Sequence, residues 1–366
     1  MATVPVSLAP TEYGTDQDVA ALSRLSFITA VHPDIILTHI LTRLDGATLA
    51  TTASTSSHLR LLCADEDLWQ KICAATWPSL TDPTTSHVIS TFPAGHRSIF
   101  YDAFPSLHHN SPSDPYRLPP PPPPPELISA VDIYYNGEPM FSRVHRTETE
   151  KNWFLTSPFC VEMLEPDGMV PTPVRFSLIF EEWARHMEES LRLSWVVIDP
   201  TLKRAANVSS RRPVWVRRHW LTRDLEAAFA IVMEAEEVRC WVKVTWCGKF
   251  GRKVYVRKVK MEMEDAEGGH VRGEEAVGIL QRAMESGVRK RVVVDGGGCG
   301  VEAVMKSYEK FSCMVKERRK RKHRRQEMMD VASTLLAFAV FLLFCFLIYS
   351  TNNLLTYDEH VSGCIA

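Results

Sequence analysis

The last hydrophobic segment of the chain constrains its fold more than any other feature. Residues 331–350, VASTLLAFAVFLLFCFLIYS, contain no charged side chain. An α-helix rises about 1.5 Å per residue, so this segment spans roughly 30 Å, the thickness of the hydrocarbon core of a bilayer. We therefore predict a single transmembrane helix over 328–350. The alternative is a buried helix of a soluble core, although few core helices run this far without a polar residue.

A cluster of basic residues precedes the apolar segment. Residues 316–325, KERRKRKHRR, hold eight Lys or Arg and one Glu, and the basic juxtamembrane segment is taken as 316–327. The tail that follows the apolar segment, 351–366, contains two acidic residues but no Lys or Arg. Because basic flanks stay on the cytosolic side, we predict a cytosolic N-terminal body, a C-terminal membrane anchor and a short non-cytosolic tail. A nuclear signal is the alternative interpretation of the basic cluster.

Bulk composition narrows the class of protein. The net charge of the 366-residue chain is −2, and because the basic cluster contributes +7, the remainder carries −9. We therefore expect no nucleic-acid partner. The nine cysteines include no CxxC pair, so the sequence predicts neither a zinc site nor a disulfide framework. Residues 1–29 lack the continuous apolar core of a secretory signal and are predicted to form a loose leader.

A proline-rich stretch divides the body into two parts. Residues 108–126, HHNSPSDPYRLPPPPPPPE, include seven consecutive prolines. Proline fixes φ and donates no backbone hydrogen bond, so we predict a stiff extended linker. A polyproline ligand for a partner domain is the alternative. A compact helical region is expected over 30–107, and a mixed α+β domain over 127–315.

Residues 127–311 mix the periodicities of strands and helices. The clearest strand is 237–246, in which Val238, Cys240, Val242, Val244 and Trp246 share one face, as in a half-buried strand. Further along, the apolar alternation changes phase, which predicts a β-bulge near Arg257-Lys258. Other strands are expected at 127–135, 175–180 and 193–198, and helices at 221–235, 274–286 and 307–326.

A segment of short helices lies near the N-terminus. Pro33 suits the first turn of a helix, and Asp34 favours its positive end. Ile36, Ile40 and Leu44 fall on one face of this helix. About forty residues of short helices can hardly bury all their apolar faces, so we expect the segment to dock on a partner. The alternative is a small helical core complete in itself.

The same segment resembles an F-box, the motif through which substrate adaptors join the Skp1–cullin ubiquitin ligase. The resemblance rests on Pro33-Asp34-Ile35-Ile36, Ile40-Leu41 and Asp67-Leu68-Trp69, with Leu44 and Leu49 between them. His32 stands where Leu is usual, and residues 52–58, TASTSSH, replace the usual Val-Cys-basic-basic-Trp stretch. The resemblance implies a Skp1-like partner, and through it a cullin, bound by Pro33, Asp34, Ile35, Ile36, Ile40, Leu41, Leu44, Leu49, Leu68 and Trp69.

The residues that follow strengthen this resemblance. Residues 74–80, AATWPSL, and 92–107, FPAGHRSIFYDAFPSL, are similar to the extension found in a plant F-box subfamily. Several members of that subfamily also end in a hydrophobic segment. The resemblance implies that 127–315 recognises a target protein. Replacing Ile40 and Leu41 together by Asp is predicted to abolish Skp1 binding, because burying charge at an apolar interface is costly.

Other candidate sites carry weaker signals. Residues 295–300, DGGGCG, lack the Gly-Lys-Ser/Thr of a phosphate loop, and His108-His109 has no third metal ligand at suitable spacing. Glu181-Glu182 suits the first turn of a helix better than an acid–base pair. The basic residues around Trp215 could bind nucleic acid, but the alternation there favours a sheet strand. We therefore predict no catalytic residue, cofactor or metal.

These observations give an α+β protein with a helical F-box region, a proline linker, a mixed C-terminal domain and a single transmembrane helix. The first hypothesis is a non-catalytic adaptor that binds Skp1 and presents an unknown target to a ubiquitin ligase at a membrane. The second is a membrane-tethered scaffold without ligase coupling, suggested by the divergent 52–58 stretch. The third is a membrane-bound enzyme housed in the C-terminal domain.

Overall fold

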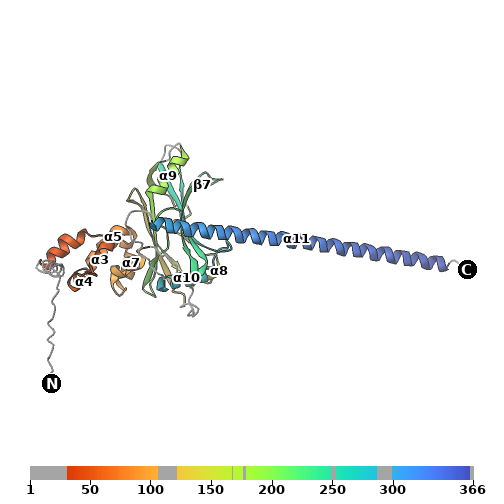
Figure 1. Ribbon diagram of the computed structural model, residues 1–366, viewed down its shortest axis with the longest axis horizontal. Coiled ribbons are helices and arrows are strands. Elements are labelled where there is room, and N and C mark those ends of the chain that lie inside the picture. Colours follow the sequence, from red (N-terminus) through yellow and green to blue (C-terminus); the bar gives the residue numbers. More distant parts are fainter. Residues whose placement is uncertain are drawn as a thin grey trace, which may run out of the picture.

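The computed structural model describes residues 31–105, 122–166, 168–175, 179–248, 253–286 and 299–362. Along the long axis of the molecule lie a helical region, a double-sheet domain and one very long helix (Figure 1). This arrangement confirms the predicted α+β class, with a helical N-terminal region, a sheet-rich domain and a long apolar C-terminal helix. The predicted leader and most of the proline linker lie outside the described residues.

The helical region is a chain of short helices. Polar residues start four of them: Asp45, Ser56, Asp65 and Asp82 each accept a hydrogen bond from a backbone N–H of the first turn. Such caps satisfy N–H groups that have no partner inside the helix. The elements are α2 (Pro33–Ile35), η1 (Ile36–Ile40), η2 (Leu41–Arg43), α3 (Gly46–Thr52), α4 (Ser57–Leu62), α5 (Glu66–Thr76), η3 (Pro78–Thr81), α6 (Pro83–Ser90) and α7 (Gly95–Ala103).

Two antiparallel sheets form the next domain. The first has the order β2-β1-β5-β6, with β1 (Glu126–Tyr135), β2 (Glu138–Glu148), β5 (Leu191–Asp199) and β6 (Arg204–Asn207). The second has the order β3-β10-β9-β8-β7, with β4 also paired to β10. Its strands are β3 (Cys160–Glu162), β4 (Val170–Arg175), β7 (Trp215–Arg218), β8 (Leu225–Met233), β9 (Val238–Cys247) and β10 (Lys253–Asp265).

The facing sides of the sheets enclose one hydrophobic core. Trp195 of β5, Phe229 of β8 and Trp246 of β9 are fully buried in it. Three helices, α8 (Asn152–Thr156), α9 (Phe180–Ser190) and α10 (Gly273–Ser286), add buried side chains to the same core. Alternation of side chains along each strand leaves a second face on each sheet to be covered.

The helical region covers the outer face of the first sheet. Ile128 and Ala130 of β1, with Val196 and Ile198 of β5, share a buried cluster with the helices. A polar contact reinforces this packing, because buried Asp132 of β1 accepts hydrogen bonds from the backbone and hydroxyl of Ser79. The regions on either side of the predicted proline linker are therefore in direct contact.

Helix α11 (Cys299–Ser362) covers the outer face of the second sheet and then leaves the body. The rings of Tyr308 and Trp241 stack with centroids 5.9 Å apart. Arg239 donates a hydrogen bond to Ser312 and pairs with Glu264. The outer face of β9, expected to be the less buried face of its strand, is therefore largely covered by a helix.

Most predicted elements are confirmed, and one is wrong. The structure contains the predicted strands at 127–135, 193–198 and 237–246, the predicted helices at 274–286 and 307–326, and the bulge near Arg257-Lys258. The predicted helix 221–235 is instead strand β8, because both faces of this alanine-rich segment are buried and its helical periodicity has no solvent side. Residues 176–178 of the predicted strand 175–180 lie outside the described residues; Arg175 ends β4, and Phe180 begins α9.

Candidate functional site

The first helical segment contains one widened turn. Pro33 starts the segment, and the Nδ1 of His32 accepts a hydrogen bond from the backbone of Asp34 at 3.3 Å. The backbone N–H of Leu41 then bonds to the carbonyl of Ile36, five residues earlier, which makes η1 a π-turn. Residues five apart diverge on an ordinary α-helix of about 3.6 residues per turn, but a π-turn brings them toward the same side.

The segment divides its apolar residues between an inner and an outer face. Ile36 and Leu41 are only 2% and 1% exposed, and they pack into the helical core. Ile35 and Ile40 are each 50% exposed, and Pro33 beside them is exposed as well. We call Pro33, Ile35 and Ile40 the outer apolar strip. It presents branched apolar side chains to solvent beside a buried core, as a docking surface does.

The inner face rests on an aromatic core. Trp69 is fully buried; its Nε1 donates to the carbonyl of Cys63 at 2.7 Å, and its ring lies 5.2 Å from that of Phe100. Gly46 begins α3 against this core, where a Cβ would overlap the Phe100 ring. These contacts fix the position of the segment that carries the strip.

The ten residues predicted to bind Skp1 are thereby separated into two groups. Ile36, Leu41, Leu49, Leu68 and Trp69 are buried and can only support the surface, whereas Pro33, Asp34, Ile35 and Ile40 are exposed. Leu44 is partly buried against the same core. Skp1 binding by these residues stays a prediction. Because Leu41 is buried, replacing Ile40 and Leu41 together by Asp would test folding as much as binding.

Two further features of the region were missed in the sequence. Leu61 of α4 is 76% exposed and adds apolar surface outside the predicted set. The divergent 52–58 stretch has a local structural role, since Ser56 accepts a hydrogen bond from Leu59 N and caps α4. An apolar residue that breaks the inward pattern of its helix was the signal for Leu61.

Those remaining candidates that fall on described residues do not assemble into a second site. Glu181 and Glu182 lie in the first turn of α9, and the segment around Trp215 forms β7, both as expected. His108-His109 and most of 295–300 lie outside the described residues. Within the described part of the chain, no group of three or more His, Cys, Asp and Glu is placed to hold a metal ion.

Comparisons with known proteins point to the same region. An F-box-like family model matches residues 33–75, from the start of α2 into the last turn of α5. An F-box protein of Arabidopsis thaliana is 41% identical over 330 residues, covering 86% of this chain and 94% of the relative. A second F-box protein of that plant is 38% identical over 341 residues, covering 89% and 92%. A probable F-box protein is 41% identical over 321 residues, covering 87% and 93%. No solved structure matches the chain.

Proposed function

The chain belongs to the F-box proteins, and on that premise we propose that it is a substrate adaptor of a Skp1–cullin ubiquitin ligase that works at a membrane surface. The observation that carries the proposal is the outer apolar strip, whose exposed isoleucines lie within the residues that match the F-box-like family. The adaptor itself performs no chemistry. It raises the effective concentration of target lysines near the ubiquitin-conjugating enzyme.

The double-sheet domain is the part that we assign to the target. It carries exposed large apolar residues, among them Trp153 of α8 and Trp220 and Leu221 of the loop between β7 and β8, with Trp220 83% exposed. Because the domain shares a core with the helical region, a bound target would be held at a fixed distance from Skp1. A rigid adaptor of this kind favours transfer to lysines within a limited zone.

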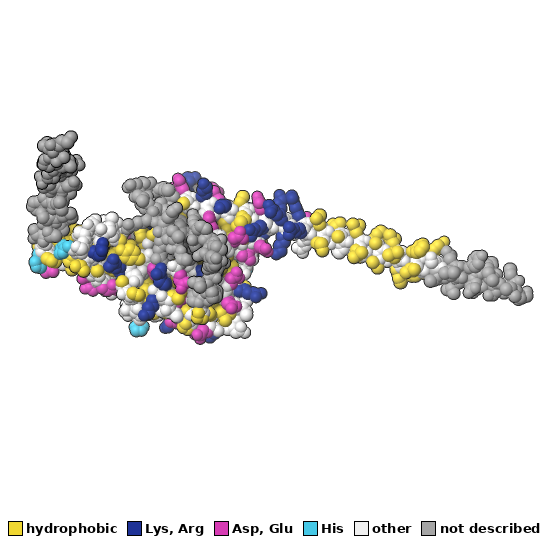
Figure 2. Space-filling model, turned by 60° about the horizontal axis from the view of Figure 1, so that its bottom comes forward, with side chains coloured by type: hydrophobic (Ala, Val, Ile, Leu, Met, Phe, Trp, Pro, Cys, Tyr) yellow, Lys and Arg dark blue, Asp and Glu magenta, His cyan; other side chains and the backbone are white. Residues whose placement is uncertain are grey.

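Helix α11 is the part that we assign to the membrane. It is the one helix among the described residues that is long and apolar enough to cross a bilayer, and its apolar stretch is unburied by the body. In Figure 2 the basic side chains gather where α11 leaves the body, and the helix beyond them is covered by hydrophobic side chains. This order supports a body on the cytosolic side.

Titration of the full chain, in neutral detergent, with purified plant Skp1 tests the ligase part of the proposal. Ile35→Asp plus Ile40→Asp should weaken binding by about 100-fold or more, because charge would be buried at an apolar contact. Trp220→Asp plus Leu221→Asp is the matched control: it introduces the same charges at exposed apolar sites of the other domain. Equal affinity for all three proteins would refute the assignment. No Skp1 binding by the unaltered chain would favour the tethered scaffold.

A further inference from the structure

The basic run of α11 begins with a turn that is anchored to the body. Arg318 pairs with Glu237 through two hydrogen bonds of 2.9 Å. Arg319 donates to Glu264 at 2.8 Å and to the carbonyl of Gly268 at 2.9 Å. These bonds fix the start of the run against the turn before β9, the end of β10 and the turn that follows β10.

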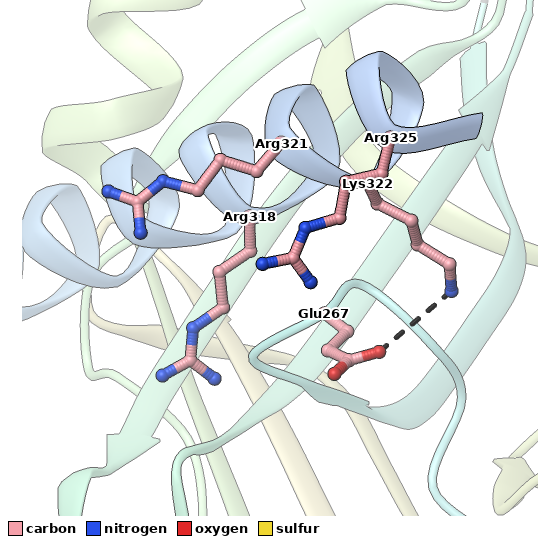
Figure 3. Close-up of a pocket in the computed structure, with 5 residues that line it drawn as sticks. All are labelled: Glu267, Arg318, Arg321, Lys322 and Arg325. Carbon is pink, nitrogen blue, oxygen red and sulfur yellow. Dashed lines mark ion pairs between the residues drawn. The ribbon is translucent and has the colours of Figure 1, made fainter. Parts of the chain in front are cut away.

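The next two turns carry charge that the body neutralises only in part. Arg318, Arg321, Lys322 and Arg325 recur at the spacing of one helix face and line a hollow of about 320 Å³, with Glu267 opposite them. Figure 3 shows Glu267 on the loop that faces these four side chains. Lys322 Nζ is 3.8 Å from Glu267, and Arg321 is 3.7 Å from Glu317 on its own helix. Arg325 makes no ion pair within the described part of the chain.

From this geometry we infer that the hollow binds a polyphosphorylated lipid headgroup in the membrane that α11 enters, and this inference rests on the proposed anchoring. The four cations pair with three carboxylates, Glu237, Glu317 and Glu267, so one positive charge remains in excess, on Arg325. Guanidinium groups bind phosphate oxygens in pairs. The volume lies within the usual range of small-ligand sites, about 300–1,000 Å³.

The position of the hollow along the helix favours a lipid over a ligand from solution. Arg325 precedes Val331 by six residues, which is about 9 Å along a helix. The headgroup layer on one side of a bilayer is roughly 5–8 Å thick. A helix that enters the hydrocarbon core at Val331 therefore places Arg325 at the outer edge of the headgroup layer and the rest of the hollow further out, where a headgroup that projects from the layer would meet it.

The chain offers a matched control outside the hollow on the same helix. Lys320 lies about 150° and Arg324 about 110° around the helix from the centre of the hollow, if each residue turns the helix by about 100°. Both are exposed and have no ion pair within the described residues. Replacing both by Gln removes as much charge, at almost the same height, as replacing Arg321 and Arg325 by Gln.

The test measures binding of a short-chain phosphatidylinositol bisphosphate to the full chain in neutral detergent. Arg321→Gln plus Arg325→Gln should weaken binding roughly tenfold or more, whereas Lys320→Gln plus Arg324→Gln should change it less than about threefold. Glu267→Gln should strengthen binding, because it removes the opposing carboxylate. Equal losses of affinity in the two double variants would overturn the headgroup site in favour of diffuse electrostatic attraction. The absence of binding by the unaltered chain would also overturn the headgroup site.

Two further measurements separate the possible failures. Soluble inositol trisphosphate that binds as tightly as the lipid would show that the site takes a free phosphate compound and would overturn the lipid source. Flotation of the full chain with vesicles of phosphatidylcholine alone, after an alkaline carbonate wash, tests anchoring without any anionic lipid. Flotation without selective binding would refute the headgroup site alone, whereas no flotation would refute the proposed anchoring.

Discussion

Asp132 is the residue through which the helical region and the sheet domain are most directly tested as one unit. It is fully buried on β1 and accepts hydrogen bonds from Ser79 N at 2.9 Å and Ser79 Oγ at 2.6 Å. Asp132→Ala would remove both bonds and leave the Ser79 N–H buried without that partner.

The expected loss of stability in Asp132→Ala combines the two lost hydrogen bonds with one opposing effect, the relief of a buried charge. Each buried bond contributes about 1–3 kcal/mol, so losing both costs about 2–6 kcal/mol. Burial raises the pKa of the Asp132 carboxyl, so the native state penalises the charged form and alanine relieves part of that penalty. We expect Asp132→Ala to lower the free energy of unfolding by about 2–4 kcal/mol. Asp132→Asn keeps an acceptor for Ser79 N and should lose about 1 kcal/mol or less.

Hydrogen exchange on the full chain in neutral detergent measures the loss of stability in the helical region and in the sheet domain. Because the regions share a core, peptides from α5 and from β5 should lose protection together in Asp132→Ala. Asp34→Ala is the control, since Asp34 is exposed and its loss should change stability by less than about 0.5 kcal/mol. Loss of protection in α5 alone, with β5 unchanged, would refute the coupling.

Ionisation of the Asp132 carboxyl should make the stability of the folded chain depend on pH in a definite direction. Its pKa is higher in the folded chain than in the unfolded chain, so its contribution to stability is full below the unfolded pKa and is lost as pH rises through the folded pKa. Asp132→Asn cannot ionise at this position. The stability of the unaltered chain relative to Asp132→Asn should therefore fall as pH rises through that window. A difference that stays constant with pH would contradict the assignment.

Two further predictions concern the candidate site. Leu41→Ala should lower the free energy of unfolding by about 2–5 kcal/mol through the cavity it leaves, whereas Ile40→Ala should lower it by about 0.5 kcal/mol or less and instead weaken Skp1 binding several-fold. Urea unfolding measures the first effect, and titration with Skp1 measures the second. The reverse pattern would show that the inner and outer faces are misassigned. Gly46→Ala should cost about 1–3 kcal/mol in thermal unfolding, because its Cβ would overlap the Phe100 ring. An unchanged melting temperature would show that the ring can move aside freely.

The sequence predicted elements whose pattern repeats within one segment. The alternation of 237–246 correctly predicts β9, and the phase change near Arg257 correctly predicts the bulge within β10. Strand β8 was predicted as a helix because Ala227, Ala228 and Ala230 suit a helix by local preference. Its true conformation depends on neighbours from both sides, the core on one and α11 on the other.

The candidate site shows the same limit. The motif located the right segment, but it could not separate exposed from buried positions, because the π-turn at 36–40 changes which residues share a side. Asp132 is the one charged residue in the apolar strand LISAVDIYY, and this pattern could have indicated a buried polar contact, although none was predicted from it. Its partner Ser79 lies 53 residues earlier, and no local pattern connects the two.

The continuity of α11 also determines how freely the protein can move. A flexible tether lets a domain search a volume that grows with the length of the tether, and lets it tilt in any direction. Here the helix that packs on the second sheet runs without a break into the apolar segment, and the helical region lies at the opposite end of the molecule (Figure 1). If that segment crosses a bilayer, the body is held at a fixed distance from the membrane by a continuous helix. The ligase would then act in a thin layer at one height above the membrane, and targets closer to the surface or further from it would be spared.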